Sequence, residues 1–230
     1  MRQWIAPATL TILVLAAAVT ATAASDSAAA APTTQPTTRA TPYDVKLEPN
    51  ATPQEVVQAK WKAVVDVLQA KKLDEPAKGS HIERIVKPLF DFPLMARLAV
   101  GRTYWARMSP EQRRRYVDLF TQHLKRSYRG KIGLYEGEQV RAPRRLENDR
   151  PDSDPPKSKR IAKVPLQLVS SKREIMILHK LRKTESRWLI YDVEVEGVSI
   201  VRSYRAQFRD ILSGGGVDEL LARLAKRPQS

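Results

Sequence analysis

The sequence predicts an α+β protein in which amphipathic helices pack on a small twisted antiparallel sheet. Two observations carry this expectation. Apolar residues recur at helical spacing before Gly137 and again after Ser199, whereas they alternate with other residues between Val164 and Val195. Spacing of three and four residues places side chains on one face of a helix, and strict alternation places them on one face of a strand. The chain therefore changes from helix to sheet and back to helix within one layered domain.

The first two expected helices lie near the start of the folded part. Thr52 and Glu55 form a capping box around a proline, which predicts a helix over about residues 53–71. A second, short helix is expected to open at Gly79 and to break at Pro88, because proline cannot continue a helix. Both helices carry apolar residues on one face.

Two further helices are expected before the sheet. Asp91 is placed to cap one of them, and Gly101 is placed to end it. Ser109 and Gln112 form another capping box, and a long stripe of apolar and aromatic residues follows it. This stripe predicts a long helix with one buried face.

Alternating apolar residues predict strands within residues 164–168, 175–181 and 189–195, with a further short strand at 138–141. Residues 144–160 are polar and rich in proline and aspartate, which predicts a mobile loop. After the sheet, a helix is expected to run from Ile200 to Leu212 and to stop at the glycines that follow, before a last short helix.

The start of the chain is interpreted as an export signal followed by a tether. Residues 1–23 combine a basic start, a short apolar run and an Ala-x-Ala site, as in a secretory signal peptide. An uncleaved membrane anchor is the less favoured alternative. Residues 24–52 are mainly Ala, Thr, Pro and Ser, which predicts a disordered tether. A single domain is expected over residues 53–228.

Composition and charge exclude some functions and favour others. The chain has no cysteine, which excludes thiol catalysis and thiolate metal sites. Its formal charge is +15, and residues 141–187 hold fourteen Lys or Arg against six Asp or Glu, a net of +8. The positive electrostatic field of such a stretch favours binding to an anionic membrane, to nucleic acid or to an acidic protein partner. An equal alternative is that the basic surface only keeps the protein soluble. Because this stretch contains no aromatic residue, nucleic-acid binding is not expected.

Neither a metal site nor a catalytic site is predicted. The sequence lacks the G-x-S-x-G nucleophile elbow, the H-E-x-x-H zinc motif and the phosphate-binding P-loop. The histidines, none of which has a second histidine at ligand spacing, are His81, His123 and His179. Asp192, Glu194 and Glu196 are two residues apart and could share one face of a strand, where clustered carboxylates can form a general acid. Neutralisation of these acids by neighbouring Lys and Arg is the favoured interpretation.

The segment from Trp188 to Phe208, WLIYDVEVEGVSIVRSYRAQF, resembles the W-x-x-Y-D-V, E-G-V-S and Y-R-x-x-F pattern of the MlaC family of phospholipid-binding proteins, also called the toluene-tolerance family. Two more pieces follow the family's order: Phe90-Asp91-Phe92 with Met95, Gly101 and Trp105, and then Ser109 to Gln112 with Phe120 and Tyr128. The resemblance covers roughly residues 53–225. Residues 144–160 and the tether are longer than is usual in the family.

The resemblance implies a function as well as a fold. It implies a nuclear-transport-factor-2-like cone with an apolar cavity that carries phospholipid as cargo in the periplasm, without catalysis and without a cofactor. Its implied partners are an inner-membrane ABC lipid transporter complex and an outer-membrane lipoprotein complex, which together maintain outer-membrane lipid asymmetry. The carrier is expected to be a monomer, with the basic stretch guiding its docking.

Residues on the inward sides of the expected strands and helices are the candidate lipid-binding residues. They are Val164, Leu166, Leu168, Ile175 and Ile177 from the strands, and Phe120, Leu124, Tyr128, Val201, Tyr204 and Phe208 from the helices. Gly197 is expected to supply a tight turn, and Asp192 is expected to pair with Arg205.

Two alternatives stay open at this point. Cone-shaped folds of this kind also host isomerase or dehydratase sites built from Asp, His and Tyr, and a polar pocket floor would favour such an enzyme. The other alternative is a non-catalytic exported adaptor with a solid core and a basic face that binds a partner. An apolar cavity that holds lipid would separate the carrier from both.

Overall fold

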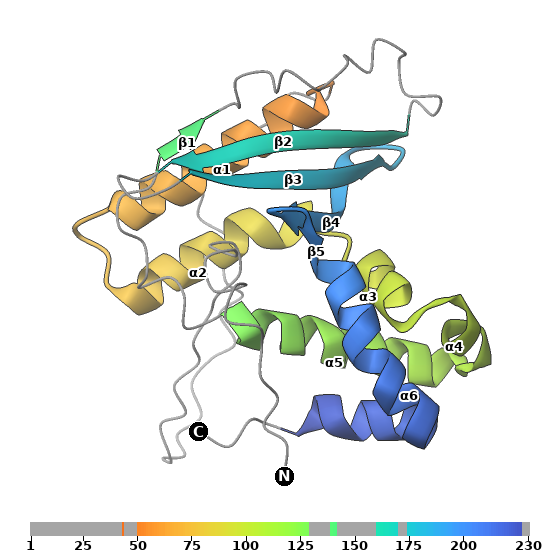
Figure 1. Ribbon diagram of the computed structural model, residues 1–230. Helices are drawn as coiled ribbons and strands as arrows, with labels where there is room; N and C mark the ends of the chain where they lie inside the picture. Colours follow the sequence, from red (N-terminus) through yellow and green to blue (C-terminus); the bar gives the residue numbers. More distant parts are fainter. Residues whose placement is uncertain (1–42, 44–49, 129–138, 142–159, 170–173, 227–230) are drawn as a thin grey trace, which may run out of the picture.

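Helices cover one face of an antiparallel sheet and extend well beyond it (Figure 1). The structure, a computed structural model, describes the following parts of the chain: Tyr43 and residues 50–128, 139–141, 160–169 and 174–226. The expected signal peptide, most of the expected tether and nearly all of the expected mobile loop lie outside these residues.

The described helices and strands follow the order that the sequence predicts. The helices are α1 (Pro53–Gln69), α2 (Glu75–Val86), a 3-10 turn (Lys87–Leu89), α3 (Phe92–Val100), α4 (Arg102–Arg107), α5 (Pro110–Tyr128) and α6 (Ile200–Ala225). The strands are β1 (Gln139–Arg141), β2 (Ile161–Val169), β3 (Glu174–Lys183), β4 (Trp188–Val195) and β5 (Val198–Ser199).

In the described part of the chain, five strands form one sheet in the order β1-β2-β3-β4-β5, and every neighbouring pair is antiparallel. The register between β3 and β4 shifts after Lys180, which faces Asp192, so that Leu181 faces Ile190 and Tyr191 is an extra residue. Such a bulge adds local twist to a sheet. The predicted fold class, helices on a small antiparallel sheet, is confirmed.

The turn between β4 and β5 confirms the expectation for Gly197. Glu196 and Gly197 have φ values of 46° and 78°, and they separate Val195 and Val198, which pair across the hairpin. A two-residue hairpin turn of this type needs positive φ at both positions, which glycine adopts without strain. The Glu196 side chain accepts a hydrogen bond of 2.6 Å from the Met176 backbone N–H, which holds the turn against β3.

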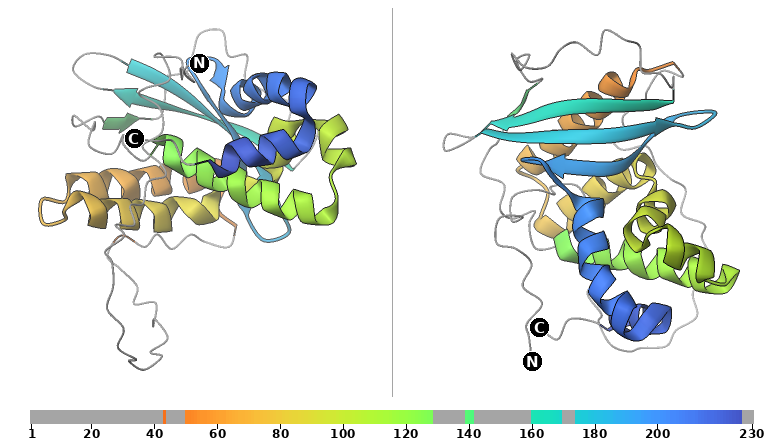
Figure 2. Two further views of the ribbon diagram at one scale, coloured as in Figure 1. Left: turned by 90° about the horizontal axis from the view of Figure 1, so that it is seen from below. Right: turned by 45° about the vertical axis from the view of Figure 1, so that its right-hand side comes forward.

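α1 and α2 form a helical hairpin beside the sheet (Figure 2). Thr52 and Glu55 make the predicted capping box at the start of α1. α2 starts earlier than predicted, because the Asp74 carboxylate accepts a hydrogen bond of 2.8 Å from the Ala77 N–H. Gly79, the predicted start, lies buried inside the helix instead.

The caps predicted for α3 and α5 are present. The Asp91 carboxylate accepts from the Leu94 N–H at 3.1 Å, and Gly101, with φ of 83°, follows α3. Ser109 Oγ accepts from the Gln112 N–H at 3.1 Å, while Gln112 Oε1 accepts from the Ser109 N–H at 3.0 Å. These bonds satisfy N–H groups that the first turn of a helix leaves free.

One feature of the helical layer differs from the prediction. The short α4 was not predicted, and it has no side-chain cap. The predicted stop at the glycines, before a last short helix, is confirmed: α6 consists of two helical segments that meet at Gly216, where φ is 70° and ψ is −162°. The turn is visible at the far end of α6 (Figure 2). Of the helices that the structure describes, none is both long enough and apolar enough to span a membrane.

Candidate functional site

The candidate residues on the strands share the covered face of the sheet. Leu166 pairs with Ile177 and Leu168 pairs with Ile175 across β2 and β3. All four side chains, like that of Val164, are exposed by 7% or less. Strand alternation explains the arrangement, because residues two apart point to the same face.

The candidate residues on the helices form an aromatic group where α5 packs on α6. The ring of Phe120 lies 5.4 Å from that of Tyr204 and 6.2 Å from that of Phe208, and both pairs meet edge to face. Leu124 and Val201 are buried beside them. Side chains four residues apart along each helix lie on one face, which explains why these residues meet. The side chain of the remaining candidate, Tyr128, lies outside the described part.

The two groups belong to one continuous buried cluster, which we call the inner cluster. Ten of the eleven candidates are therefore brought together as predicted, although their role in lipid binding stays a prediction. The prediction did not include three other large members, Met95, Tyr116 and Leu181, which are almost fully buried in the same cluster. Helical spacing on α3 and α5 and alternation on β3 were the signals that could have identified them.

Polar groups in the inner cluster have partners inside the protein. The Tyr116 hydroxyl donates to the backbone carbonyl of Ala96 at 3.1 Å, and burial raises the pKa of that hydroxyl. The Tyr204 hydroxyl donates to Ser127 Oγ at 3.3 Å. Because these polar atoms are satisfied locally, the surface that the rings present is apolar.

His179 is the buried histidine of the sheet. Its Nε2 accepts a hydrogen bond of 2.9 Å from Trp61 Nε1, which joins α1 to β3. With Nε2 as the acceptor, Nδ1 carries the proton and faces the Val164 carbonyl at 3.4 Å. Burial lowers the pKa of His179 to about 4, so the ring is neutral at pH 7. The ring is thus part of the packing between helix and sheet.

The acidic residues of β4 hold the start of α6 rather than forming a general acid. Asp192 accepts from Ser199 Oγ at 2.8 Å and from the Val201 N–H at 3.2 Å, and it forms an ion pair with Lys180. The expected partner of Asp192, Arg205, instead donates from Nε to the Leu98 carbonyl at 2.9 Å. That pairing was wrong because Arg205 lies on the α3 side of α6.

Glu194 stays ionised in this network. Burial acts to raise its pKa, but the hydrogen bond from Lys180 and the charges of Lys180, Arg202 and Lys163 hold the pKa below its ordinary value. An ionised carboxylate that is paired with cations is a poor proton donor. Within the described residues, no three His, Asp or Glu side chains gather as a metal-binding group.

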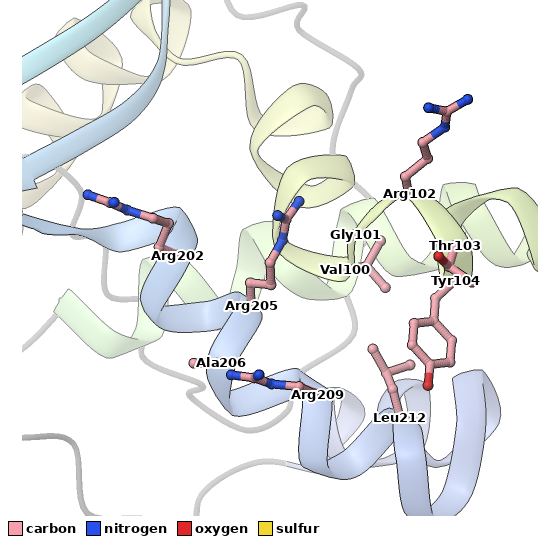
Figure 3. A pocket seen from close by; sticks show the side chains of 10 residues that line it. All are labelled: Val100, Gly101, Arg102, Thr103, Tyr104, Arg202, Arg205, Ala206, Arg209 and Leu212. Carbon is pink, nitrogen blue, oxygen red and sulfur yellow. The ribbon is translucent and has the colours of Figure 1, made fainter.

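A pocket of about 420 Å³ opens between the α3–α4 junction and the face of α6 that carries Arg202, Arg205 and Arg209 (Figure 3). We call it the arginine pocket after four of its lining residues: Arg102, Arg202, Arg205 and Arg209. None of the predicted lipid-binding residues lines it. The sequence carried one signal for it, since positions 202, 205 and 209 share one helical face.

Comparison with known proteins places the chain in a family. The family model described as "MlaC protein" matches residues 58–226, which include every described helix and strand except the first turns of α1. The chain belongs to the MlaC family. No curated protein matches it significantly.

A solved structure shares the MlaC-family fold of this chain. It is the phospholipid-binding protein from Ralstonia solanacearum in complex with a phospholipid. The two chains are 23% identical, the match covers 76% of this chain and 100% of that one, and the TM-score is 0.61. The similarity supports the arrangement of helices on the antiparallel sheet that is described above.

Proposed function

We propose that this protein is a periplasmic phospholipid carrier that binds acyl chains within the inner cluster. The observation that carries the proposal is the continuous buried apolar cluster that joins the covered sheet face to the α5–α6 aromatic group. The Ralstonia solanacearum protein, which has the same fold, is described as phospholipid-binding. The secretory signal expected over residues 1–23 is consistent with a periplasmic location.

Energetics favour a carrier that exchanges lipid without its own energy source. Each buried methylene is worth roughly 0.8 kcal/mol relative to water, so two acyl chains gain far more than any observed binding affinity. The bilayer offers the same gain, and transfer between bilayer and protein is therefore nearly neutral. Direction must come from the partners, which we propose are an inner-membrane ABC lipid transporter complex and an outer-membrane lipoprotein complex.

The sheet face and the aromatic group are suited to line the two sides of an acyl-chain site. Both are built from side chains without charge, and their tyrosine hydroxyls are bonded to protein groups. An acyl chain makes no hydrogen bonds, so an apolar lining of this kind binds it without leaving polar groups unpaired. We propose that an acyl chain enters by separating the packed side chains of these two groups.

The test is the lipid content of the protein as purified from cells. Native mass spectrometry and organic extraction are expected to find diacyl phospholipid bound to the folded protein. Protein that emerges without lipid, and that takes up none from liposomes of mixed phospholipids, would overturn the proposal.

A matched pair of variants on β3 tests the position of the lipid. Ile177 is exposed by 1% on the covered face, whereas the adjacent Leu178 is only half-buried on the other face. Ile177→Arg places a charge in the acyl-chain site at a cost of several kcal/mol, and it should abolish loading. Leu178→Arg should retain lipid. Circular dichroism shows whether both variants keep the fold. A folded Ile177→Arg protein with normal lipid content would show that Ile177 does not line the acyl-chain site.

A further inference from the structure

The arginine pocket has the composition of a binding site for an anion with an apolar part. Val100 and Leu212 provide apolar surface, and both are buried members of the inner cluster. Tyr104 lines the pocket beside them, and the guanidinium of Arg107 lies 5.9 Å from the centre of its ring. Tyrosine and arginine are the residue types that contribute most at protein interfaces.

The charge of the pocket is one-sided. Among the described residues that line it, four are arginines and none is acidic. Arg102 and Arg209 are exposed and form no ion pair with the described residues. Arg205 uses one guanidinium nitrogen for the Leu98 carbonyl, and Arg202 pairs with Glu194 at 2.7 Å. Most guanidinium donors of the pocket are therefore available to an external anion.

The arrangement of the arginines favours an extended anion over a compact one. The Cα atoms of Arg202 and Arg209 are about 10 Å apart along α6, since a helix rises 1.5 Å per residue. Figure 3 shows the guanidinium groups of Arg102, Arg202, Arg205 and Arg209 spread around the pocket and pointing in different directions. A single phosphate would need guanidinium groups that converge on one point. Several carboxylates along a peptide match the observed spread.

We infer that the arginine pocket docks an acidic segment of a protein partner. Its carboxylates pair with the arginines, and an apolar side chain of the same segment contacts Val100, Tyr104 and Leu212. The concave apolar floor distinguishes this site from a flat patch that would rest on a membrane. The inference goes beyond lipid carriage, because none of the candidate lipid-binding residues lines the arginine pocket.

The test measures binding of a fluorescent peptide made of glutamates with one central leucine, using the full chain. Arg102→Glu combined with Arg209→Glu reverses two pocket charges that form no ion pair with the residues that the structure describes. Its matched control is Lys71→Glu combined with Lys72→Glu, which makes the same charge change in the exposed turn between α1 and α2. That turn lies far from α4 and α6 (Figure 1).

We expect the pocket variant to weaken peptide binding by roughly tenfold or more, as at interface hot spots, and the control to leave it nearly unchanged. Replacing the leucine of the peptide with serine should also weaken binding. Equal losses in both variants would mean non-specific electrostatics and would overturn the inference. So would an absence of peptide binding, displacement of the peptide by inorganic phosphate at matched ionic strength, or binding of anionic phospholipid vesicles through the same arginines without peptide binding.

Discussion

At the scale of single residues, the sequence reveals side-chain type but not the partner that a distant segment supplies. Trp61 and His179 are 118 positions apart, yet their side chains share a hydrogen bond in the buried interface between α1 and β3. His179 was interpreted as an isolated residue. The alternation of its strand points it inward with Ile177 and Leu181, but nothing local identifies Trp61 as its partner. Its neutral state follows from that burial, which disfavours the charged imidazolium.

The first prediction concerns the dependence of stability on pH. The pKa of His179 is lowered from 6.5 to about 4 in the folded state, so the unfolded state binds the proton more tightly. The contribution of neutral His179 to the free energy of unfolding is fully present above pH 6.5 and is lost as the pH falls from 6.5 to 4. The free energy of unfolding falls by on the order of 3 kcal/mol through this group.

Denaturant unfolding of the wild type and of a Trp61→Phe, His179→Leu double variant measures this effect. The double variant removes both hydrogen-bonding partners, so it leaves no buried donor unpaired. Other groups titrate equally in both proteins, including His123, whose pKa is also lowered by burial. The difference between the two plots of unfolding free energy against pH therefore isolates the effect of His179. Curves that run parallel from pH 6.5 to 4 would contradict the prediction.

At the scale of helices and strands, local chemistry predicted most boundaries. The caps at Thr52, Asp91 and Ser109 were expected and are present, because capping depends on residues within one turn. α4 was missed, since it is six residues long and has no side-chain cap. The start of α2 was missed because Asp74 was not recognised as a cap; buried Gly79 then looked like a beginning rather than a packing position.

The candidate site was predictable in one part and not in another. Periodicity identified the inward residues of β2, β3, α5 and α6, because burial follows directly from the period of each element. The arginine pocket was not identified, although three of its arginines share a face of α6. Its other side comes from the α3–α4 junction, about a hundred residues earlier in the chain, and only tertiary packing brings Arg102 near Arg209.

The second prediction concerns the turn in α6. Gly216 has φ of 70° and ψ of −162°, a conformation that is essentially restricted to glycine, and a Cβ there would meet no atom within 4 Å. Gly216→Ala should therefore lower the free energy of unfolding by about 1–3 kcal/mol through backbone strain alone. Gly214 is the matched control, because it is helical and also has open space at the Cβ position.

Gly214→Ala should raise the free energy of unfolding by about 0.5–1 kcal/mol, since alanine loses less backbone entropy than glycine on folding. Thermal or urea unfolding of the two variants measures both effects. Changes of the same sign at the two positions would show that the turn in α6 is not as described.

At the scale of the whole molecule, part of the positive charge is used inside the fold. The basic stretch over residues 141–187 was expected to guide docking, which stays a prediction, and two of its cations have internal partners. Lys180 pairs with Asp192 and Glu194, and Arg182 pairs with Asp91. Asp91 also caps α3, so the Arg182 ion pair connects the sheet to the helical layer. Arg102 and Arg209 of the arginine pocket have no such partners among the described residues, which supports the docking role inferred for them.

The last prediction separates cargo binding from docking. Acyl chains carry no charge, so the ratio of lipid to protein should be independent of salt. Docking of an acidic partner should weaken as the Debye length shrinks from about 10 Å at 0.1 M salt to about 3 Å at 1 M. Arg102→Glu combined with Arg209→Glu should therefore slow lipid transfer from the protein to membranes that contain its partner complex, mainly through the association rate, while the bound lipid remains in place.

The measurements are the transfer rate and the lipid content of one preparation, with the Lys71→Glu, Lys72→Glu protein as control. A pocket variant that loses its lipid, yet transfers at the normal rate per loaded molecule, would assign these arginines to the cargo site instead.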